Sequence, residues 1–257
     1  MYKVFSFFSL IQHPLFRYIS CKNIIVIFLF HGFLCFPAKT KNNSENNSTE
    51  KSPTYEPNVP EPKCRADLIK YWIPLSLDDK TANRALWIAK DGAKVVRKTD
   101  DAICPVLERP ERYEYAPQVL CKDGILGFRG YWEVEVSGWV VVGVACEQAG
   151  RRNTDGPCGF GDNEESWGIG WSGSCYQAWH KGQNKEIRGV PECSTIGVYL
   201  DHPAGLLHFY AVENLKEDTG GKEVILLQQI KSSFKEKMMP GFWLGMQSEC
   251  SIMKKEA

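Results

Sequence analysis

The chain has 257 residues, of which 43% are hydrophobic and 12% aromatic, and its 31 basic side chains balance its 31 acidic ones. That length suits one large β domain with an appendage, or two small domains. A neutral chain without a basic stripe has no electrostatic reason to bind nucleic acid or an anionic membrane, so we expect neither partner. The aromatic content favours strands over helices.

Ten cysteines are spread along the chain, and no two of them are close enough to form a CxxC pair. No histidine follows at the spacing of a zinc finger, so we expect no structural zinc, other metal or cofactor. Several cysteines lie inside apparent strands, such as Cys146 after an apolar run, where a free thiol behaves as a small hydrophobic side chain. Reduced thiols of this kind favour a cytoplasmic protein.

Residues 1–38 form a hydrophobic segment whose composition differs from that of the rest of the chain. Its apolar run from Ile24 to Phe36 has thirteen residues, fewer than the about 20 that a membrane-spanning helix needs. Three basic residues precede the run, as in a signal peptide, although no good small-residue cleavage site follows Phe36. Three interpretations stay open: a signal or membrane anchor, a misassigned start that resembles translated AT-rich DNA, and a buried segment.

Residues 39–63 are polar, contain several prolines and have almost no apolar side chains. Such a segment cannot bury enough surface to fold, so we expect a disordered linker. Overlapping N-x-S/T sequons lie at Asn42, Asn46 and Asn47, and they become glycosylation candidates if the N-terminus enters the secretory pathway. A linker rich in Asn and Ser also produces such sequons by chance.

The folded part is predicted to run from Cys64 to Ser251 and to begin with a short helical turn. Arg65–Tyr71 fits that turn, and it leads into an expected strand at Ile73–Leu77. Turn signals rich in Asp, Asn, Gly and Pro then recur at short intervals along the chain. Many short segments between such signals are typical of an all-β sandwich or barrel.

Two neighbouring segments show the clearest strand patterns. Tyr131–Val136 alternates between apolar and polar side chains, which indicates a half-buried strand with Glu133 and Glu135 on its solvated outer face. After a Ser-Gly break, Trp139–Ala145 is apolar on both faces, which indicates a core strand that is covered on both sides. These two strands are expected to belong to a stacked all-β domain.

A hairpin is predicted where Val198–Asp201 and Leu206–Tyr210 flank an HPAG turn. His202 lies in this turn, where we expect a solvated side chain, and His208 lies on the second strand, where we expect a packed or hydrogen-bonded ring. His180 is then the best exposed candidate among the histidines of the folded part.

The residues do not predict catalysis. The chain lacks a GxSxG or HExxH motif and a Walker loop, and the glycines of Gly156–Gly161 do not precede a helix. Glu133 and Glu135 have the spacing of paired carboxylates, but they alternate with core residues on a strand. We therefore expect no enzymatic activity and no catalytic residues.

Three loops are predicted to carry the binding chemistry, because loops vary while strands hold a scaffold. They are Gln148–Asp155, Ser172–His180 and Lys181–Arg188. Aromatic and Arg side chains dominate many protein interfaces, and both occur in these loops. For Trp179, a place in the core of the sandwich is an open alternative. The predicted partner-binding residues are Arg151, Arg152, Asn153, Asp155, Tyr176, Trp179, His180, Lys185 and Arg188.

A series of motifs in a fixed order resembles the PRY–SPRY (B30.2/SPRY) domain family. The motifs are LSLDDKTAN (75–83), YAPQVLC (115–121), GYWEVEV (130–136), ESWGIG (165–170), IGVYLD (196–201), AGLLHFY (204–210) and MPGF (239–242). The set is similar to the C-terminal domains of fish tripartite-motif proteins, fish NACHT/leucine-rich-repeat receptors and stonefish-toxin subunits. Asp79 departs from the pattern, because the family commonly has Pro at this position of the first motif.

The resemblance implies a bent antiparallel β-sandwich, a concanavalin-like jelly roll, with a short helical or extended PRY segment beside it. The domain would span 64–251, with PRY at about 64–127 and SPRY at about 128–251. It also implies a protein-recognition module with a protein partner, in an innate-immune or regulatory setting in the cytoplasm. The alternative is a secreted or membrane-anchored, toxin-like or receptor-like subunit, and an unrecognised enzyme is a distant third. In some relatives a pair of loop aromatics captures the partner, but the matching positions here are Gly170 and Ser172.

Overall fold

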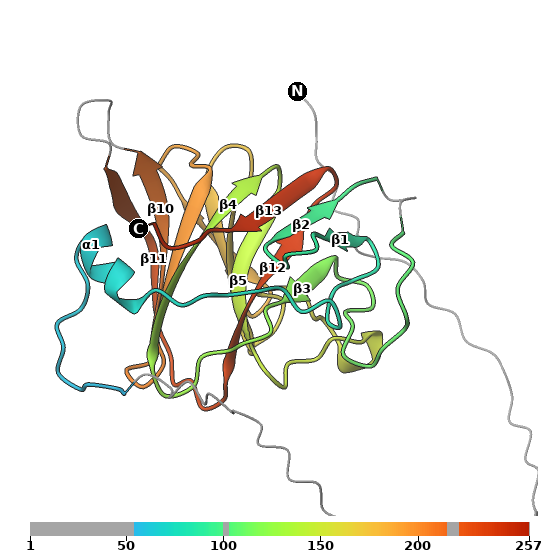
Figure 1. The fold of residues 1–257 in the computed structure, drawn as a ribbon, viewed down its shortest axis with the longest axis horizontal. Helices are drawn as coiled ribbons and strands as arrows, with labels where there is room; N and C mark the ends of the chain where they lie inside the picture. Colours follow the sequence, from blue (N-terminus) through green and yellow to red (C-terminus); the bar gives the residue numbers. More distant parts are fainter. Residues whose placement is uncertain (1–53, 100–102, 215–220, 257) are drawn as a thin grey trace, which may run out of the picture. The chain divides into compact units, whose positions relative to one another are not determined.

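The computed structural model describes residues 54–99, 103–214 and 221–256. These residues form a seven-stranded and a six-stranded sheet that pack into a sandwich (Figure 1). Neighbouring strands are antiparallel in both sheets, for example β4 with β9 and β5 with β6. The all-β antiparallel sandwich that the sequence predicts is therefore confirmed. The segment 1–38 and the sequons at Asn42, Asn46 and Asn47 lie outside the described residues.

The strand order is β1-β2-β13-β4-β9-β10-β11 in the larger sheet and β3-β12-β5-β6-β7-β8 in the smaller one. The helical elements are α1 (Arg65–Leu68), η1 (Ile69–Tyr71) and η2 (Asn153–Asp155). The strands are β1 (Leu86–Ile88), β2 (Lys94–Arg97), β3 (Gln118–Leu120), β4 (Arg129–Ser137), β5 (Val140–Cys146), β6 (Ser166–Trp171), β7 (Tyr176–His180), β8 (Gln183–Ile187), β9 (Thr195–Asp201), β10 (Leu206–Asn214), β11 (Lys222–Lys231), β12 (Met238–Leu244) and β13 (Ser248–Ile252).

The predicted helical turn at Arg65–Tyr71 is present as α1 followed by η1, and it packs on the outer face of the seven-stranded sheet. Leu68 of α1 is buried there against the Tyr131 and Tyr199 rings of β4 and β9. The strand predicted at Ile73–Leu77 is wrong, because this segment forms only one isolated bridge, from Leu77 to Cys121, and a second bridge lies just before it, from Trp72 to Tyr131. The chain runs extended here but lacks a continuous ladder partner.

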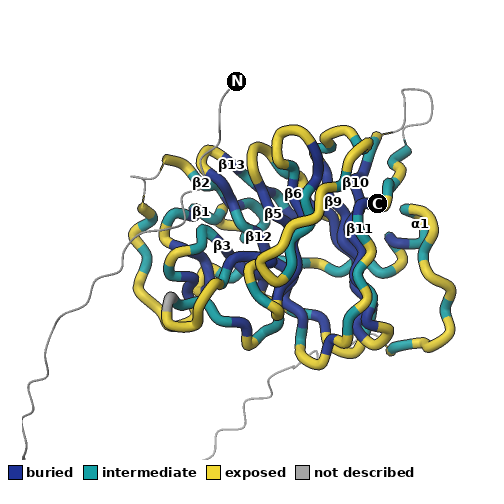
Figure 2. The backbone as a smooth tube through the Cα atoms, turned by 180° about the vertical axis from the view of Figure 1, so that it is seen from behind, coloured by how far each residue is buried: buried dark blue, intermediate teal, exposed yellow. Residues whose placement is uncertain are grey.

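The main core lies between the sheets, and Figure 2 shows buried residues along the inner strands. Trp132 of β4 and Val142 of β5 are buried in this core with most of the larger apolar side chains. The two strands belong to different sheets, because the chain crosses over at Gly138. The expectation for Trp139 was wrong: this residue occupies the crossover, and its side chain is 54% exposed. The remaining residues of the predicted core strand are buried in β5.

The predicted hairpin is confirmed as β9 and β10, which pair from Asp201 opposite Leu206 onward. His208 is buried on β10, as expected, and its Nδ1 lies 3.0 Å from the Tyr210 hydroxyl. The expectation for His202 was wrong, because this turn side chain is buried and its Nε2 lies 2.8 Å from the Glu236 carbonyl oxygen. The turn folds back onto the segment before β12, which shields the imidazole from water.

Loops cover the outer face of the six-stranded sheet. Phe160 lies on this face over glycines of three adjacent strands, Gly143, Gly168 and Gly241, where an added Cβ would come within 3.1 Å of the Phe160 side chain. Tyr113 is buried in the same apolar cluster. Because these three glycines have no side chain, the Phe160 ring and its loop can lie directly on the sheet. Phe160 and Tyr113 thereby hold the loops 148–163 and 107–114 close to this face.

Candidate recognition surface

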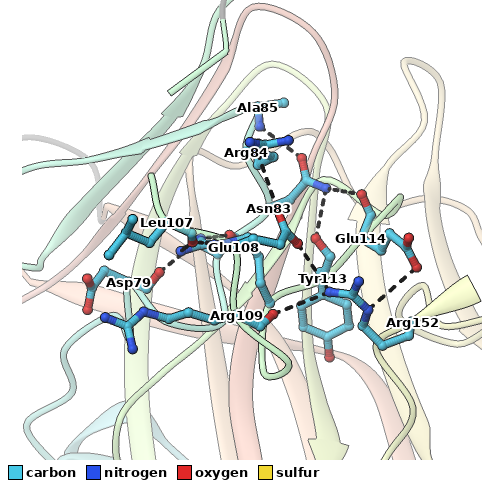
Figure 3. A network of polar contacts seen from close by, with 12 residues as sticks. Asp79, Asn83, Arg84, Ala85, Leu107, Glu108, Arg109, Tyr113, Glu114 and Arg152 are labelled. Carbon is cyan, nitrogen blue, oxygen red and sulfur yellow. Dashed lines mark hydrogen bonds and ion pairs between the residues drawn. The ribbon is translucent and has the colours of Figure 1, made fainter. Parts of the chain in front are cut away.

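A charged contact joins two loops on this side of the molecule, the segments 107–114 and 148–155. The Arg152 guanidinium lies 3.2 Å from a Glu108 carboxylate oxygen and 3.6 Å from a Glu114 carboxylate oxygen. Arg152 also donates to the Arg109 carbonyl oxygen. Figure 3 shows the Arg152 side chain between Arg109 and Glu114. The three charged side chains stay partly exposed, so the network presents both signs of charge to solvent.

Buried polar groups hold the first of these loops in place. Arg112 is only 2% exposed, and its guanidinium donates to the carbonyl oxygens of Asp79, Ala82 and Leu107. The Asn83 amide also donates to the Tyr113 and Glu114 carbonyl oxygens, at 3.1 and 3.0 Å (Figure 3). Because an unpaired buried donor is costly, these bonds fix the backbone that carries the exposed glutamates.

The second loop is closed by Asp155. Its carboxylate accepts hydrogen bonds from the backbone N–H groups of Arg151 and Arg152, at 3.0 and 2.9 Å. These bonds lower the pKa of Asp155 below its ordinary value. The Arg151 guanidinium donates to the Glu147 carbonyl oxygen at 2.8 Å, so both arginines are engaged within the molecule. Asn153 lies in η2, and its side chain is not described.

An open depression of about 440 Å³ lies between these loops and the strand ends. Its lining combines cations and carboxylates, and no aromatic ring contributes to it. The lining residues are Pro110, Glu147, Gln148, Ala149, Gly150, Arg151, Arg152, Asp155 and Glu165. Such a surface can form charged and hydrogen-bonded contacts with a protein surface, and three of the predicted binding residues meet here.

The other two predicted loops are largely an ordered hairpin, because β7 and β8 pair across a two-residue turn. Tyr176 was expected to contact a partner, and this expectation was wrong: its side chain is 1% exposed in the core. Its hydroxyl oxygen accepts a hydrogen bond from the Cys193 backbone N–H at 2.8 Å, and burial raises the pKa of Tyr176 to about 12. Tyr176 therefore supports the fold.

The remaining predicted residues of this hairpin are accessible. Trp179 is half-buried and packs on the outer cluster around Phe160, so it lies outside the core between the sheets. His180 stacks on Trp167, with ring centroids 4.7 Å apart and an interplanar angle of 13°. Its Nδ1 lies 2.9 Å from the Ser166 carbonyl oxygen. The exposed Lys185 and Arg188 contact Gln228 and Glu186, respectively.

Six of the nine predicted residues thus form two groups on either side of the start of β6: Arg151, Arg152 and Asp155 in one, and Trp179, His180 and Lys185 in the other. Glu165, just before β6, lines the charged depression, whereas Trp167 lines a second, aromatic groove together with Trp179 and His180. Sequence reasoning missed the partners Glu108 and Glu114 and the buried Arg112. The dense alternation of charges in the stretch ERPERYE (108–114) was the available signal for them.

The described residues show no group of three or more His, Cys, Asp or Glu side chains that could hold a metal ion. Within 54–99, 103–214 and 221–256, no helix is long and apolar enough to cross a membrane. Eight cysteines in these ranges are free thiols, and three of them, Cys121, Cys175 and Cys250, are buried. Burial raises the pKa of the Cys121 and Cys250 thiols, which keeps them protonated and unreactive.

Comparisons with known proteins agree with this geometry. Residues 129–256 match the SPRY domain model, and residues 75–125 match the model of the SPRY-associated domain PRY. The mouse (Mus musculus) tripartite motif-containing protein 16 is 30% identical over 74% of this chain, and stonustoxin subunit beta of Synanceia horrida is 34% identical over 74%. The chain spans 33% and 26% of the length of these two relatives.

A solved structure, the TRIM65 PSpry domain, superposes with a TM-score of 0.64 at 26% identity, and the match covers 76% of this chain and 98% of that one. A two-sheet sandwich with loops covering one face and a short helix on the other defines the class as an antiparallel β-sandwich domain. The chain belongs to the PRY–SPRY family.

Proposed function

We propose that residues 64–251 are a non-enzymatic protein-recognition module, with PRY at about 64–127 and SPRY at about 128–251. Its principal contact surface is the charged loop face, defined as the exposed side chains of 107–114 and 147–155 with Glu165. The ion-pair network around Arg152 carries this proposal, because it presents both charges on loops that buried bonds hold rigid. Complementary charges in such a rim direct the encounter and select the partner.

We place the module in a cytoplasmic, regulatory or innate-immune setting. The free thiols of the described residues and the similarity to tripartite-motif proteins support this setting. A secreted or membrane-anchored toxin-like subunit is the second candidate, supported by the similarity to stonustoxin and by the hydrophobic segment 1–38. Mass spectrometry of the expressed protein separates them: a trimmed N-terminus and glycans at Asn42, Asn46 or Asn47 belong only to the second.

Affinity capture from cell lysate tests the charged loop face. Arg152→Ala combined with Glu165→Ala removes two side chains that line the depression, and we expect the recovery of specific partners to fall by about tenfold or more. Lys90→Ala is the matched control, because Lys90 is an exposed cation in the turn between β1 and β2. Unchanged recovery by a double variant with an unchanged unfolding midpoint would contradict the assignment.

A further inference from the structure

The sandwich has an open side where both sheets end. β8 is the last strand of the six-stranded sheet and β11 is the last strand of the seven-stranded sheet. The two edges meet through side chains, because Lys185 Nζ lies 3.3 Å from Gln228 Oε1. A strand at the edge of a sheet has unpaired backbone groups and is a ready template for another extended chain.

A groove lies between these edges, with a volume of about 280 Å³. Its apolar floor consists of Trp167, Ala178 and Ile230. The indole of Trp167 is held between the stacked His180 ring and the edge-on Phe234 ring, whose centroid lies 5.3 Å away, so this floor is preformed. Small-molecule pockets typically have about 300–1,000 Å³, and a cavity of about 150 Å³ holds benzene. The groove is therefore sized for one large apolar side chain.

The lip of the groove is polar and carries a positive charge. Gln183 and Gln228 contribute amides and Lys185 contributes an ammonium group, whereas the amide of the neighbouring Asn184 donates to Gln177. None of the described residues that line the groove is acidic, and the Lys185 ammonium contacts the amide oxygen of Gln228. A carboxylate is the ligand group that complements an ammonium beside an apolar pocket.

The backbone of β8 adds a third element of recognition. The turn at Lys181-Gly182 has positive φ at both residues, and it is closed by the pair His180–Gln183. In such a hairpin the two residues of the closing pair form two backbone N–H···O=C hydrogen bonds with each other, and so does every second pair after it. Gln183, Lys185 and Ile187 therefore direct their backbone groups toward β7. The N–H and C=O groups of Asn184 and Glu186 therefore point toward the free edge of the sheet.

We propose that this groove, lined by β6, β7, β8 and β11, binds an extended segment of a partner protein that adds a strand to β8. One large apolar side chain of the segment enters the groove against Trp167. An acidic side chain two residues along, on the same face of the added strand, pairs with Lys185. The site is separate from the charged loop face and does not depend on it.

A second copy of the chain fits this edge less well. If two β8 strands paired antiparallel with a two-fold axis at Lys185, the two Lys185 side chains would lie directly opposite each other. With the axis at Glu186, the two Glu186 side chains would do so, and like charges in opposite positions are destabilising. A partner segment with the alternation apolar–any–acidic has no such conflict. The occupant is therefore expected to be a different protein.

A random heptapeptide library displayed on phage, selected on the full chain, tests the proposal. We expect the enriched peptides to share an apolar residue and an acidic residue two positions apart. Selection on Lys185→Glu should replace the acidic position by a basic one, and an enriched wild-type peptide should bind this variant about tenfold more weakly. Lys122→Glu introduces the same charge change at an exposed loop residue outside the groove and should leave both results unchanged.

Ala178→Phe is the second variant, because the larger side chain fills the groove while Lys185 stays in place. It should abolish peptide binding without changing binding of a partner through the charged loop face. The proposal is overturned if no peptide is enriched, or if the enriched pattern ignores Lys185→Glu. It is also overturned if sedimentation shows a dimer that Lys185→Glu dissociates, since a second copy then occupies the edge.

Discussion

Glu133 shows that a residue can be assigned to the correct face of a strand and still to the wrong environment. Alternation along β4 places the Glu133 side chain on the face of the strand away from Trp132, and the structure agrees. The expected solvation was wrong, because Glu133 is 0% exposed. Arg65 of α1 covers it and donates two hydrogen bonds to its carboxylate, at 2.7 and 3.0 Å. Alternation reports the face, but the covering residue lies 68 positions away in the sequence.

Arg65→Ala should be strongly destabilising, because it leaves the Glu133 carboxylate buried without its cation. We expect the free energy of unfolding to fall by about 3 kcal/mol, measured by urea denaturation. Lys70→Ala breaks an exposed ion pair with Asp67 close by and should barely move the midpoint. Equal effects of the two variants would show that the buried pair contributes nothing beyond a surface contact.

His208 connects stability to pH. Burial lowers the pKa of His208 below its ordinary value of 6.5, and the nearby Glu61 carboxylate offsets part of this effect. The unfolded chain therefore takes up the proton more readily than the folded one. The folded state has its full stability above about pH 6.5, the pKa of an unfolded His, and loses part of it as the pH falls below that value. We expect His208→Gln to make the decline in unfolding free energy between about pH 7 and pH 5 shallower. An identical slope for wild type and variant contradicts this.

The candidate site could be predicted from the sequence only in part, for a physical reason. Loop composition alone identified Arg151 and Arg152, since cations in a polar loop are visible locally. It could not identify Glu108 as the ion-pair partner, because that contact spans 44 residues and depends on Arg112 holding the loop. For Tyr176 the same reasoning failed, since its residue type suits both an interface and a core.

At the level of elements, the segment 54–63 is a strap across the outer face of the seven-stranded sheet. The Tyr55 ring lies 4.4 Å from the Arg129 guanidinium, which also forms a 2.6 Å ion pair with Asp201. Farther along, Glu61 contacts His208 and the Gln229 amide. These residues belong to the stretch expected to be a disordered linker, and that expectation was wrong for them, because polar side chains anchor the strap without an apolar core.

Release of the strap should be visible by proteolysis. Tyr55→Ala combined with Glu61→Ala removes both anchors, so we expect trypsin to cleave after the exposed Lys63 several times faster. The cation–π contact of Tyr55 contributes about 1 kcal/mol, which sets the scale of this change. Cleavage after Lys122, which lies in another loop, is the internal control. A parallel rise at both sites would mean that the whole domain, not the strap, has been loosened.

The hairpin of β7 and β8 was predicted as two loops because its signal is weak. Its inward-facing side chains include Lys185 and Gln183, so alternation of apolar and polar residues is lost at the open side of the sandwich. Only the Lys181-Gly182 pair was a visible turn signal. An edge strand that faces a groove in place of a packed core does not need apolar residues, and periodicity cannot find it.

In the whole molecule, the two sheets are joined at a point where the chain crosses twice. β4 leads into β5 through Gly138 and Trp139, and β12 leads into β13 through Gly245. Two hydrogen bonds connect these crossing segments. The Gly245 N–H donates to the Trp139 carbonyl oxygen at 2.7 Å, and the Trp139 N–H donates to Ser248 Oγ at 2.9 Å. Ordered family motifs predicted the sandwich, but a contact across 109 residues leaves no local pattern.

Gly138 is the residue on which this double crossing depends most directly. It has φ of +76°, and an added Cβ would lie 2.6 Å from Ser248 Oγ, the atom that accepts the Trp139 bond. Gly138→Ala should therefore cost about 1–2 kcal/mol for the left-handed backbone and about 1 kcal/mol more for the disturbed hydrogen bond. Gly127 has φ of +79° and open space around it, so Gly127→Ala isolates the backbone cost alone. Thermal unfolding should show the larger loss for Gly138→Ala, and equal losses would mean that the contact between the crossings does not stabilise the sandwich.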